Sequence, residues 1–190
     1  MCLAVSSSFA QRNRSGSYNR IGIAGGYEMR TYDGDLDLTN DGGFYIGLQT
    51  RGAFKNNWDM VYGVTLSQSN FSLGRDLEYQ QYAGQIKLMP SYNIISRHLN
   101  VDLGLTANFQ GSLERQTDDE DVNAVILAAG GAPETIETNL FGAGAIVGLS
   151  GGFEGFRATL HYEYSITNVI NDGDVQARSG RLLAGVVIYL

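Results

Sequence analysis

Three residues of the kind used in hydrolases alternate near the C-terminus, and their spacing decides what they can do. His161, Glu163 and Ser165 are the residue types of a nucleophilic triad. Residues at i, i+2 and i+4 of a strand share one face, yet neighbours on that face stand about 7 Å apart. Proton transfer between them needs contact at about 3 Å. The spacing therefore argues against a triad, and we expect no catalytic residues and no enzyme activity.

Acidic residues between 33 and 37 superficially resemble a calcium-binding loop. The run Asp33-Gly34-Asp35-Leu36-Asp37 is followed by Leu38 at the sixth position and Phe44 at the twelfth, where an EF-hand needs Gly and Glu. We expect no metal site and no cofactor-binding residue, although weak divalent-cation binding by acidic loops stays open. A second acidic run, Asp118 to Asp121, is typical of a solvated segment and also suits the start of a short helix over 122–129.

Composition narrows the class of protein. The chain has 190 residues, with 13 basic and 20 acidic side chains, a formal net charge of −7 and a single Cys. Nucleic-acid binding needs a basic surface, and a disulfide framework needs several cysteines, so both are excluded. The longest uncharged run, residues 139–153, contains five glycines and is shorter than the roughly 20 apolar residues of a spanning helix. This observation does not exclude a membrane β-barrel, because its strands have only a weak, alternating pattern of apolar residues in the sequence.

Alternation of apolar and polar residues is the main pattern of the chain, and it has the period of a β-strand. Residues 99–109 alternate without a break. Each alternating segment is about 11 to 16 residues long, which suits a tilted strand crossing a bilayer better than the roughly 5–6 residues of a soluble strand. Eight such segments are present: 18–31, 42–54, 58–71, 79–93, 98–111, 138–150, 155–167 and 180–190.

The connections between these segments alternate between short and long. Residues 55–57, 94–97 and 151–154 are predicted as tight turns, and 32–41, 72–78, 112–137 and 168–179 as longer loops. The long loops hold 15 acidic and three basic residues, a net charge of −12, against +5 for the rest of the chain. Short turns on one side and long loops on the other are typical of outer-membrane barrels. The sequence therefore predicts an all-β, eight-stranded antiparallel up-and-down transmembrane β-barrel with short periplasmic turns and longer extracellular loops.

Aromatic residues gather near the strand ends and predict two girdles at the membrane interfaces. Those expected near the short turns are Tyr18, Phe54, Trp58, Tyr92, Phe156 and Tyr189; those expected near the long loops are Tyr32, Phe44, Phe71, Tyr79, Phe109, Phe141 and Tyr164.

The alternate, polar face of the strands then points into the barrel. Eight strands leave an interior that side chains alone can fill, so we expect the charges to pair with one another there and the glycines on this face to make room for them. A narrow gated conduit stays open as an alternative to simple filling of the lumen. The predicted lumen charge network, which has a structural role, comprises Arg20, Glu28, Arg30, Arg51, Asp59, Lys87, Asp102, Arg157, His161, Glu163 and Arg181.

The N-terminal ten residues carry no charged side chain, and Ser8-Phe9-Ala10 fits the small-x-small pattern of a secretory cleavage site. We interpret residues 1–10 as the remnant of a signal peptide and 11–190 as the barrel domain, with an ordinary frayed terminus as the alternative.

Three stretches of the chain resemble known families. Residues 85–92 (QIKLMPSY), the Tyr-rich stretch 162–170 (YEYSITNVI) and the closing segment 182–190 are similar to strands of the PorT-like outer-membrane β-barrels, and in general form the chain resembles the small OmpA/OmpX-like barrels. The chain departs from such barrels by ending on Leu190 rather than on an aromatic residue. The resemblance implies an outer-membrane location, no catalytic residues and, for the PorT-like family, an accessory role in protein secretion.

Taken together, these features predict a non-enzymatic, monomeric outer-membrane barrel with a structural or surface-interaction role. Its expected partners are outer-membrane lipid and lipopolysaccharide, a surface protein bound through loop 112–137, and no nucleic acid. Two alternatives are a component of protein secretion and a soluble, lipocalin-like binding barrel.

Overall fold

The computed structural model describes residues 20–33, 38–73, 77–95, 98–116, 135–136, 138–153, 155–168, 170–172 and 175–190. The predicted signal-peptide remnant, residues 1–10, and the helix predicted over 122–129 lie outside the described residues. Within the described ranges, no helix has both the length and the apolar character needed to cross a membrane.

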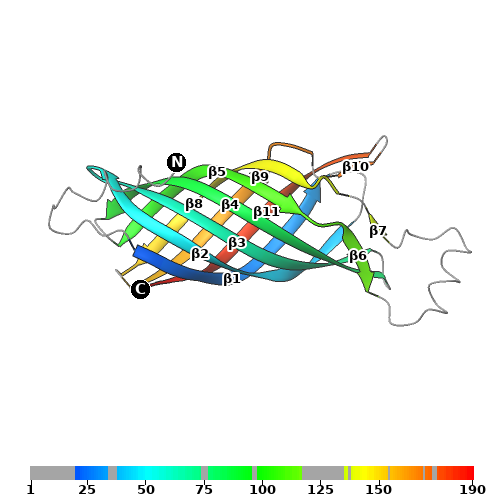
Figure 1. The fold of residues 1–190 in the computed structure, drawn as a ribbon, viewed down its shortest axis with the longest axis horizontal. Coiled ribbons are helices and arrows are strands. Elements are labelled where there is room, and N and C mark those ends of the chain that lie inside the picture. The colour runs from blue at the N-terminus through cyan, green and yellow to red at the C-terminus, as the bar shows by residue number, and fades with distance from the viewer. Residues whose placement is uncertain are drawn as a thin grey trace, which may run out of the picture.

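Eight long antiparallel strands form a closed barrel (Figure 1). Each strand pairs with the next along the chain, and β1 pairs with β11 over twelve residue pairs to close the cylinder. All eight predicted segments are found as strands, so the predicted fold class is confirmed. The barrel strands are β1 (Arg20–Asp33), β2 (Leu38–Lys55), β3 (Trp58–Leu73), β4 (Leu77–Ile95), β5 (Leu99–Gln110), β8 (Phe141–Gly152), β9 (Phe156–Ser165) and β11 (Val175–Tyr189).

The strands extend farther than predicted at one end of the barrel, which we call the loop end. Parts of the four segments predicted as loops are strand, because β2, β3, β4 and β11 continue to pair beyond the membrane-facing region. Three short strands add to them: β6 (Leu113–Gln116) pairs with β4 and with β7 (Thr135–Ile136), and β10 (Ile170–Asp172) pairs with β11. Ladder hydrogen bonds do not depend on an apolar face, so alternation alone underestimates strand length there.

The opposite end, which we call the turn end, has the predicted tight connections, and the C-terminus lies there (Figure 1). Lys55 pairs with Trp58 across a two-residue turn. Asn56 has a φ of 52° in this turn, a conformation that Asn adopts more readily than most residues.

The outer surface of the barrel is apolar and the interior is largely polar. Along β9 exposed and buried residues alternate at every position. Leu66 and Leu105 are outward and more than 60% exposed, whereas Thr65 and Thr106 are buried. This is the inverse of a soluble barrel, and an apolar belt of this extent fits only lipid. The soluble, lipocalin-like alternative is therefore excluded.

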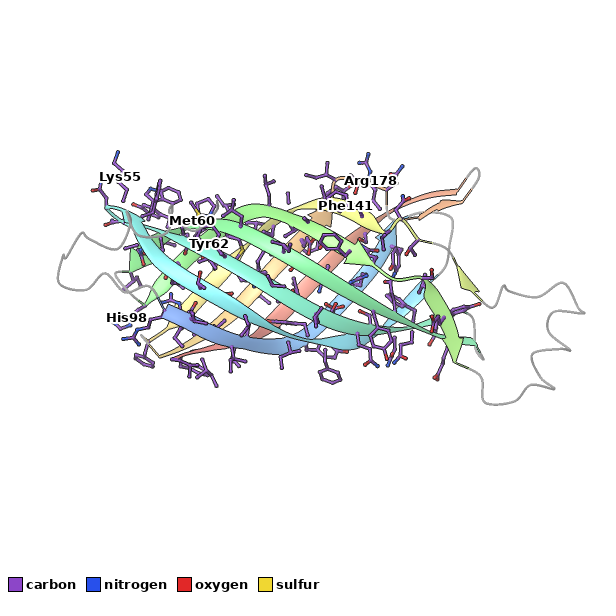
Figure 2. The ribbon with its side chains drawn as sticks, in the orientation of Figure 1. Lys55, Met60, Tyr62, His98, Phe141 and Arg178 are labelled. Atoms are coloured by element: carbon purple, nitrogen blue, oxygen red, sulfur yellow. The ribbon has the colours of Figure 1, made fainter. Side chains whose placement is uncertain are left out.

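Aromatic side chains face outward at both ends. At the turn end Trp58 and Tyr92 pack with ring centroids 5.0 Å apart, and at the loop end Phe109 and Phe141 pack at 5.5 Å. Figure 2 labels Phe141 and Arg178 at the loop end and Lys55 and His98 at the turn end.

Four of the predicted girdle residues that the structure describes face the interior, and Tyr18 lies outside the described residues. Tyr32 packs on Phe71 with ring centroids 5.3 Å apart and donates to Gln81 Oε1 at 3.0 Å. Phe71, Tyr79 and Tyr189 are buried inside the barrel. Phe71 and Tyr79 are paired across β3 and β4 in their loop-end extensions. Tyr189 shares the inward face of β11 with Val187. The position of an aromatic residue near a strand end does not settle its face, which depends on strand parity.

Candidate functional site

The polar lumen is the candidate site, because it holds most of the charged side chains among the described residues. Nine of the eleven residues assigned to the predicted network are buried. Asp59 is about one-fifth exposed and Arg20 is half-buried. The nine buried members lie on six strands and form two clusters with a lysine between them: Glu28, Arg30, Arg51, Lys87, Asp102, Arg157, His161, Glu163 and Arg181.

The first cluster, which we call the loop-end cluster, is centred on Glu28 of β1. Arg30 and Arg181 are register partners on β1 and β11, so two like charges lie opposite each other. Glu28 compensates both: Arg181 donates to its Oε2 from Nε at 2.7 Å and from Nη2, and Arg30 donates to its Oε1 at 3.5 Å. Ser69 also donates to Oε1. Like charges directly opposite are destabilising, so this carboxylate allows the strands to close.

Glu163 of β9 is the second carboxylate of the loop-end cluster. Its Oε1 accepts from Thr106 at 2.7 Å and from Asn108 at 2.6 Å. Its Oε2 accepts from Gln85 at 2.6 Å and lies 3.7 Å from Nη1 of Arg181. Both oxygens of this carboxylate are therefore hydrogen-bonded, as a buried charge requires.

The second cluster, which we call the turn-end cluster, comprises Arg51, Asp59, Asp102, Arg157 and His161. Arg51 lies 3.2 Å from Asp59 and 3.5 Å from Oδ1 of Asp102, and it donates to Ser91 and Ser150. His161 Nε2 lies 3.0 Å from Oδ2 of Asp102. Arg157 donates to Asn100 and to the backbone carbonyl of Ser150.

One glycine allows the Asp102–His161 contact to form. Asp102 on β5 and His161 on β9 are both register partners of Gly148 on the intervening β8. A Cβ at Gly148 would overlap the imidazole ring, so a side chain there would separate the pair. Similar overlaps would occur between a Cβ at Gly63 and Lys87 and between a Cβ at Gly144 and Glu163. The prediction that inner-face glycines make room for long side chains is confirmed at these positions.

Lys87 lies on β4 and is buried between the two clusters. No salt bridge within 4.0 Å and no side-chain hydrogen bond involves its ammonium group among the described residues. Its aliphatic chain packs where Gly63 leaves space on β3.

The lumen is also more apolar than the sequence indicates. Eight inward residues form one cluster, among them Met89 and Ile146, which lie on strands otherwise lined with polar groups. Strict parity counting along each strand would have found them. The cluster comprises Ala24, Tyr45, Val61, Met89, Ile146, Leu183, Val187 and Tyr189.

A small cavity of about 10 Å³ adjoins the loop-end cluster and is lined by residues that include Arg30, Gln110 and Ser179. This volume holds about one water molecule. Farther out, Phe71, Tyr79 and Leu113 are buried on the inner face of the extended strands.

The arrangement brings together none of the three residues of triad type. His161 contacts Asp102, Glu163 contacts Thr106 and its amide donors, and Ser165 donates to the backbone carbonyl of Thr167. No group of three or more potential metal ligands occurs in the part of the chain that the structure describes.

An apolar outer surface around a closed, filled eight-stranded cylinder defines a transmembrane β-barrel of the outer-membrane type. Solved structures of other proteins have the same fold. Ail, the attachment invasion locus protein of Yersinia pestis, in complex with the heparin analogue sucrose octasulfate, matches with a TM-score of 0.58 at 16% identity, covering 90% of this chain and 99% of that one. Neisserial surface protein A matches with a TM-score of 0.59 at 15% identity, covering 90% and 97%.

Both neighbours are small barrels of the OmpA/OmpX-like type, so the predicted resemblance to that type is confirmed at the level of the fold. The fold and the apolar surface together give the barrel its location, the bacterial outer membrane. No family model matches the chain, and no curated protein matches it. The PorT-like resemblance stays a prediction.

Proposed function

We propose that the barrel is a non-enzymatic anchor that presents acidic extracellular loops for contact with partners at the cell surface. The observation that carries this proposal is the filled lumen. Buried ion pairs, the apolar cluster and the inward aromatic residues occupy the interior, and they support a structural role for the charge network in place of transport or catalysis.

Charge indicates the chemistry of the partner. The segments predicted as long loops carry a net charge of −12, so they attract cationic surfaces and repel polyanions. The structure of Ail holds a sulfated heparin analogue. We infer that this chain, despite the shared fold, selects the opposite class of partner, a basic protein surface, with loop 112–137 as the main contact.

The test uses the full chain in phosphatidylcholine vesicles, with polylysine-coated and heparin-coated beads as probes. We expect capture by polylysine that falls with added salt, and no capture by heparin. Neutralising Asp118, Asp119, Glu120 and Asp121 to Asn or Gln should abolish most of the capture. Glu154→Gln, in the β8–β9 connection, is the matched control and should change nothing. Equal capture of the neutralised chain, or a preference for heparin, would overturn the proposal.

Two further expectations belong to the same proposal. The barrel acts as a monomer, and its non-enzymatic character predicts that His161→Ala alters barrel stability without removing any lipid-modifying activity. The accessory role in secretion that a PorT-like resemblance implies is the alternative function, and weak divalent-cation binding by the acidic loops stays a prediction.

A further inference from the structure

Lys87 is a buried cation without a counterion among the described residues. It is 6% exposed, and its ammonium group makes no salt bridge and no hydrogen bond there. The carboxylates of the two clusters are engaged elsewhere: Asp102 contacts Arg51 and His161, and both oxygens of Glu163 accept hydrogen bonds from other side chains. A buried ammonium group with three unsatisfied donors is costly, so a ligand that accepts from it would stabilise the barrel.

Gln49 lies on the side of the lumen toward which the lysine chain points. Gly63 on β3 is the register partner of Lys87 on β4 and of Gln49 on β2. A Cβ at Gly63 would lie 2.6 Å from Cε of Lys87 and 3.2 Å from its Cγ, so the lysine chain runs from β4 across β3 in the direction of β2. Gln49 is 2% exposed and faces the same part of the lumen.

The amide of Gln49 has one side that is hydrogen-bonded and one that is not. Its Nε2 donates to the Tyr189 hydroxyl at 2.7 Å, whereas its buried Oε1 accepts no hydrogen bond from the described residues. A half-turn of the amide keeps the contact with Tyr189, because a phenolic hydroxyl donates as well as accepts. The same half-turn brings the NH2 group to the unpartnered side, where it and the ammonium group of Lys87 can donate to one shared acceptor.

The charges of the lumen favour an anion as that acceptor. Among the buried residues that the structure describes, five cations face three carboxylates. Arg51 lies two residues from Gln49 on the same inward face of β2, so a second cation adjoins the position. An excess of positive charge in a narrow, poorly hydrated interior attracts a small anion. The turn end gives access to the lumen, because Asp59 is one-fifth exposed there.

We propose that Lys87 and Gln49 bind one chloride ion inside the barrel. An ammonium group is a compact point charge, which suits a spherical anion, whereas the planar fork of arginine suits carboxylate and phosphate. Both side chains are almost fully buried, which favours the smallest available anion. The ion compensates the lysine between the two clusters. This site goes beyond the proposed surface role and does not depend on what the extracellular loops contact.

The experiment measures urea unfolding of the full-length barrel in phosphatidylcholine vesicles, in sodium chloride and in sodium gluconate at equal ionic strength. Gluconate is the bulky reference anion, and urea is uncharged. One test variant, Lys87→Met, removes the charged donor. The other, Gln49→Glu, supplies a carboxylate in place of the ion. The matched control is Lys55→Met, which removes an exposed lysine at the turn end (Figure 2).

We expect chloride at about five times its Kd to raise the folding equilibrium constant of the unsubstituted barrel about sixfold, and that of Lys55→Met equally. Lys87→Met should not respond to chloride. In gluconate it should be at least as stable as the unsubstituted barrel, because it holds no uncompensated cation. Gln49→Glu should also lose the response and keep its stability, since its carboxylate pairs with Lys87.

An equal chloride response in Lys87→Met would overturn the inference, and so would the absence of a response in the unsubstituted barrel. Crystals grown in bromide give a readout that does not depend on stability. We expect an anomalous peak beside Nζ of Lys87 that disappears in Lys87→Met, and a map without that peak contradicts the site. Heat-modifiable mobility on a denaturing gel checks that each variant has folded.

Discussion

The two charge clusters of the lumen are built from the same residue types, yet they differ in how completely their carboxylates are satisfied. In the loop-end cluster every oxygen of Glu28 and Glu163 accepts a hydrogen bond. In the turn-end cluster Asp102 Oδ1 accepts none from the described residues, although Arg51 lies 3.5 Å away. Asp59 is partly exposed, so this end also meets solvent.

The difference indicates which of the two clusters contributes more to the stability of the barrel. A buried polar network stabilises one arrangement only when its members are satisfied. Both carboxylates of the loop-end cluster meet this condition, and their hydrogen bonds and ion pairs join β1, β11, β9, β4 and β5. In the turn-end cluster one carboxylate oxygen, Asp102 Oδ1, does not meet it among the described residues. We therefore expect substitutions at the loop end to cost more stability than equivalent ones at the turn end.

The largest effect is expected from Glu28→Ala. The substitution leaves Arg30 and Arg181 opposite each other in a buried site without their shared carboxylate. Removing one partner of a buried ion pair costs about 3–5 kcal/mol. Urea unfolding of the barrel in lipid vesicles measures the change, and Glu78→Gln on the outer surface is the control. A loss below about 1 kcal/mol would show that the cluster does not stabilise the closure of β1 on β11.

A smaller loss is expected from Asp102→Ala in the turn-end cluster. Arg51 keeps Asp59, Ser91 and Ser150 as partners, so the guanidinium is not left alone. We expect a loss of about 1–3 kcal/mol, the usual range for a buried group that loses one partner. The same urea titration ranks the two clusters, and a loss equal to that of Glu28→Ala would remove the distinction between them.

Strand alternation predicts the cylinder and its faces, but not which residues meet inside it. The parity of β3, β5 and β9 follows from the sequence because apolar residues recur at every second position. The contact between Asp102 and His161 joins positions 59 residues apart and depends on the register of both strands with β8. No local pattern encodes that register, so the network members could be predicted and their partners could not.

Alternation also does not predict where the strands end above the membrane. The segment 72–78 contains the ends of β3 and β4, yet the outward residues Ser72 and Glu78 in it are polar. Neighbouring strands remain hydrogen-bonded there although their two faces do not differ in polarity as they do in the membrane. A sequence pattern detects a strand only through that alternation of apolar and polar residues.

Substitution of Gly148 tests whether the turn-end cluster requires a residue without a side chain at this position. Gly148→Ala would place a methyl group against the His161 ring and the backbone of Leu160, and we expect a loss of about 1–2 kcal/mol from overpacking. Gly25→Ala is the matched control, because its Cβ would point outward and meet only Tyr45 O at an ordinary 3.6 Å. Thermal unfolding in detergent compares the two. Equal effects would mean that the cost comes from glycine in a strand rather than from the lumen.

The smallest effect is expected from Lys87→Met, at the boundary between the two clusters. A buried cation has lost its hydration, and among the described residues no salt bridge within 4.0 Å compensates Lys87. Methionine keeps the length and volume of the aliphatic chain beside Gly63. Replacement of a buried charge by an apolar side chain of similar shape is often neutral or stabilising. We expect a change between zero and a gain of about 1 kcal/mol in urea unfolding. A loss above about 1 kcal/mol would instead make Lys87 an electrostatic link between Asp102 and Glu163, and the two clusters would then act as one network.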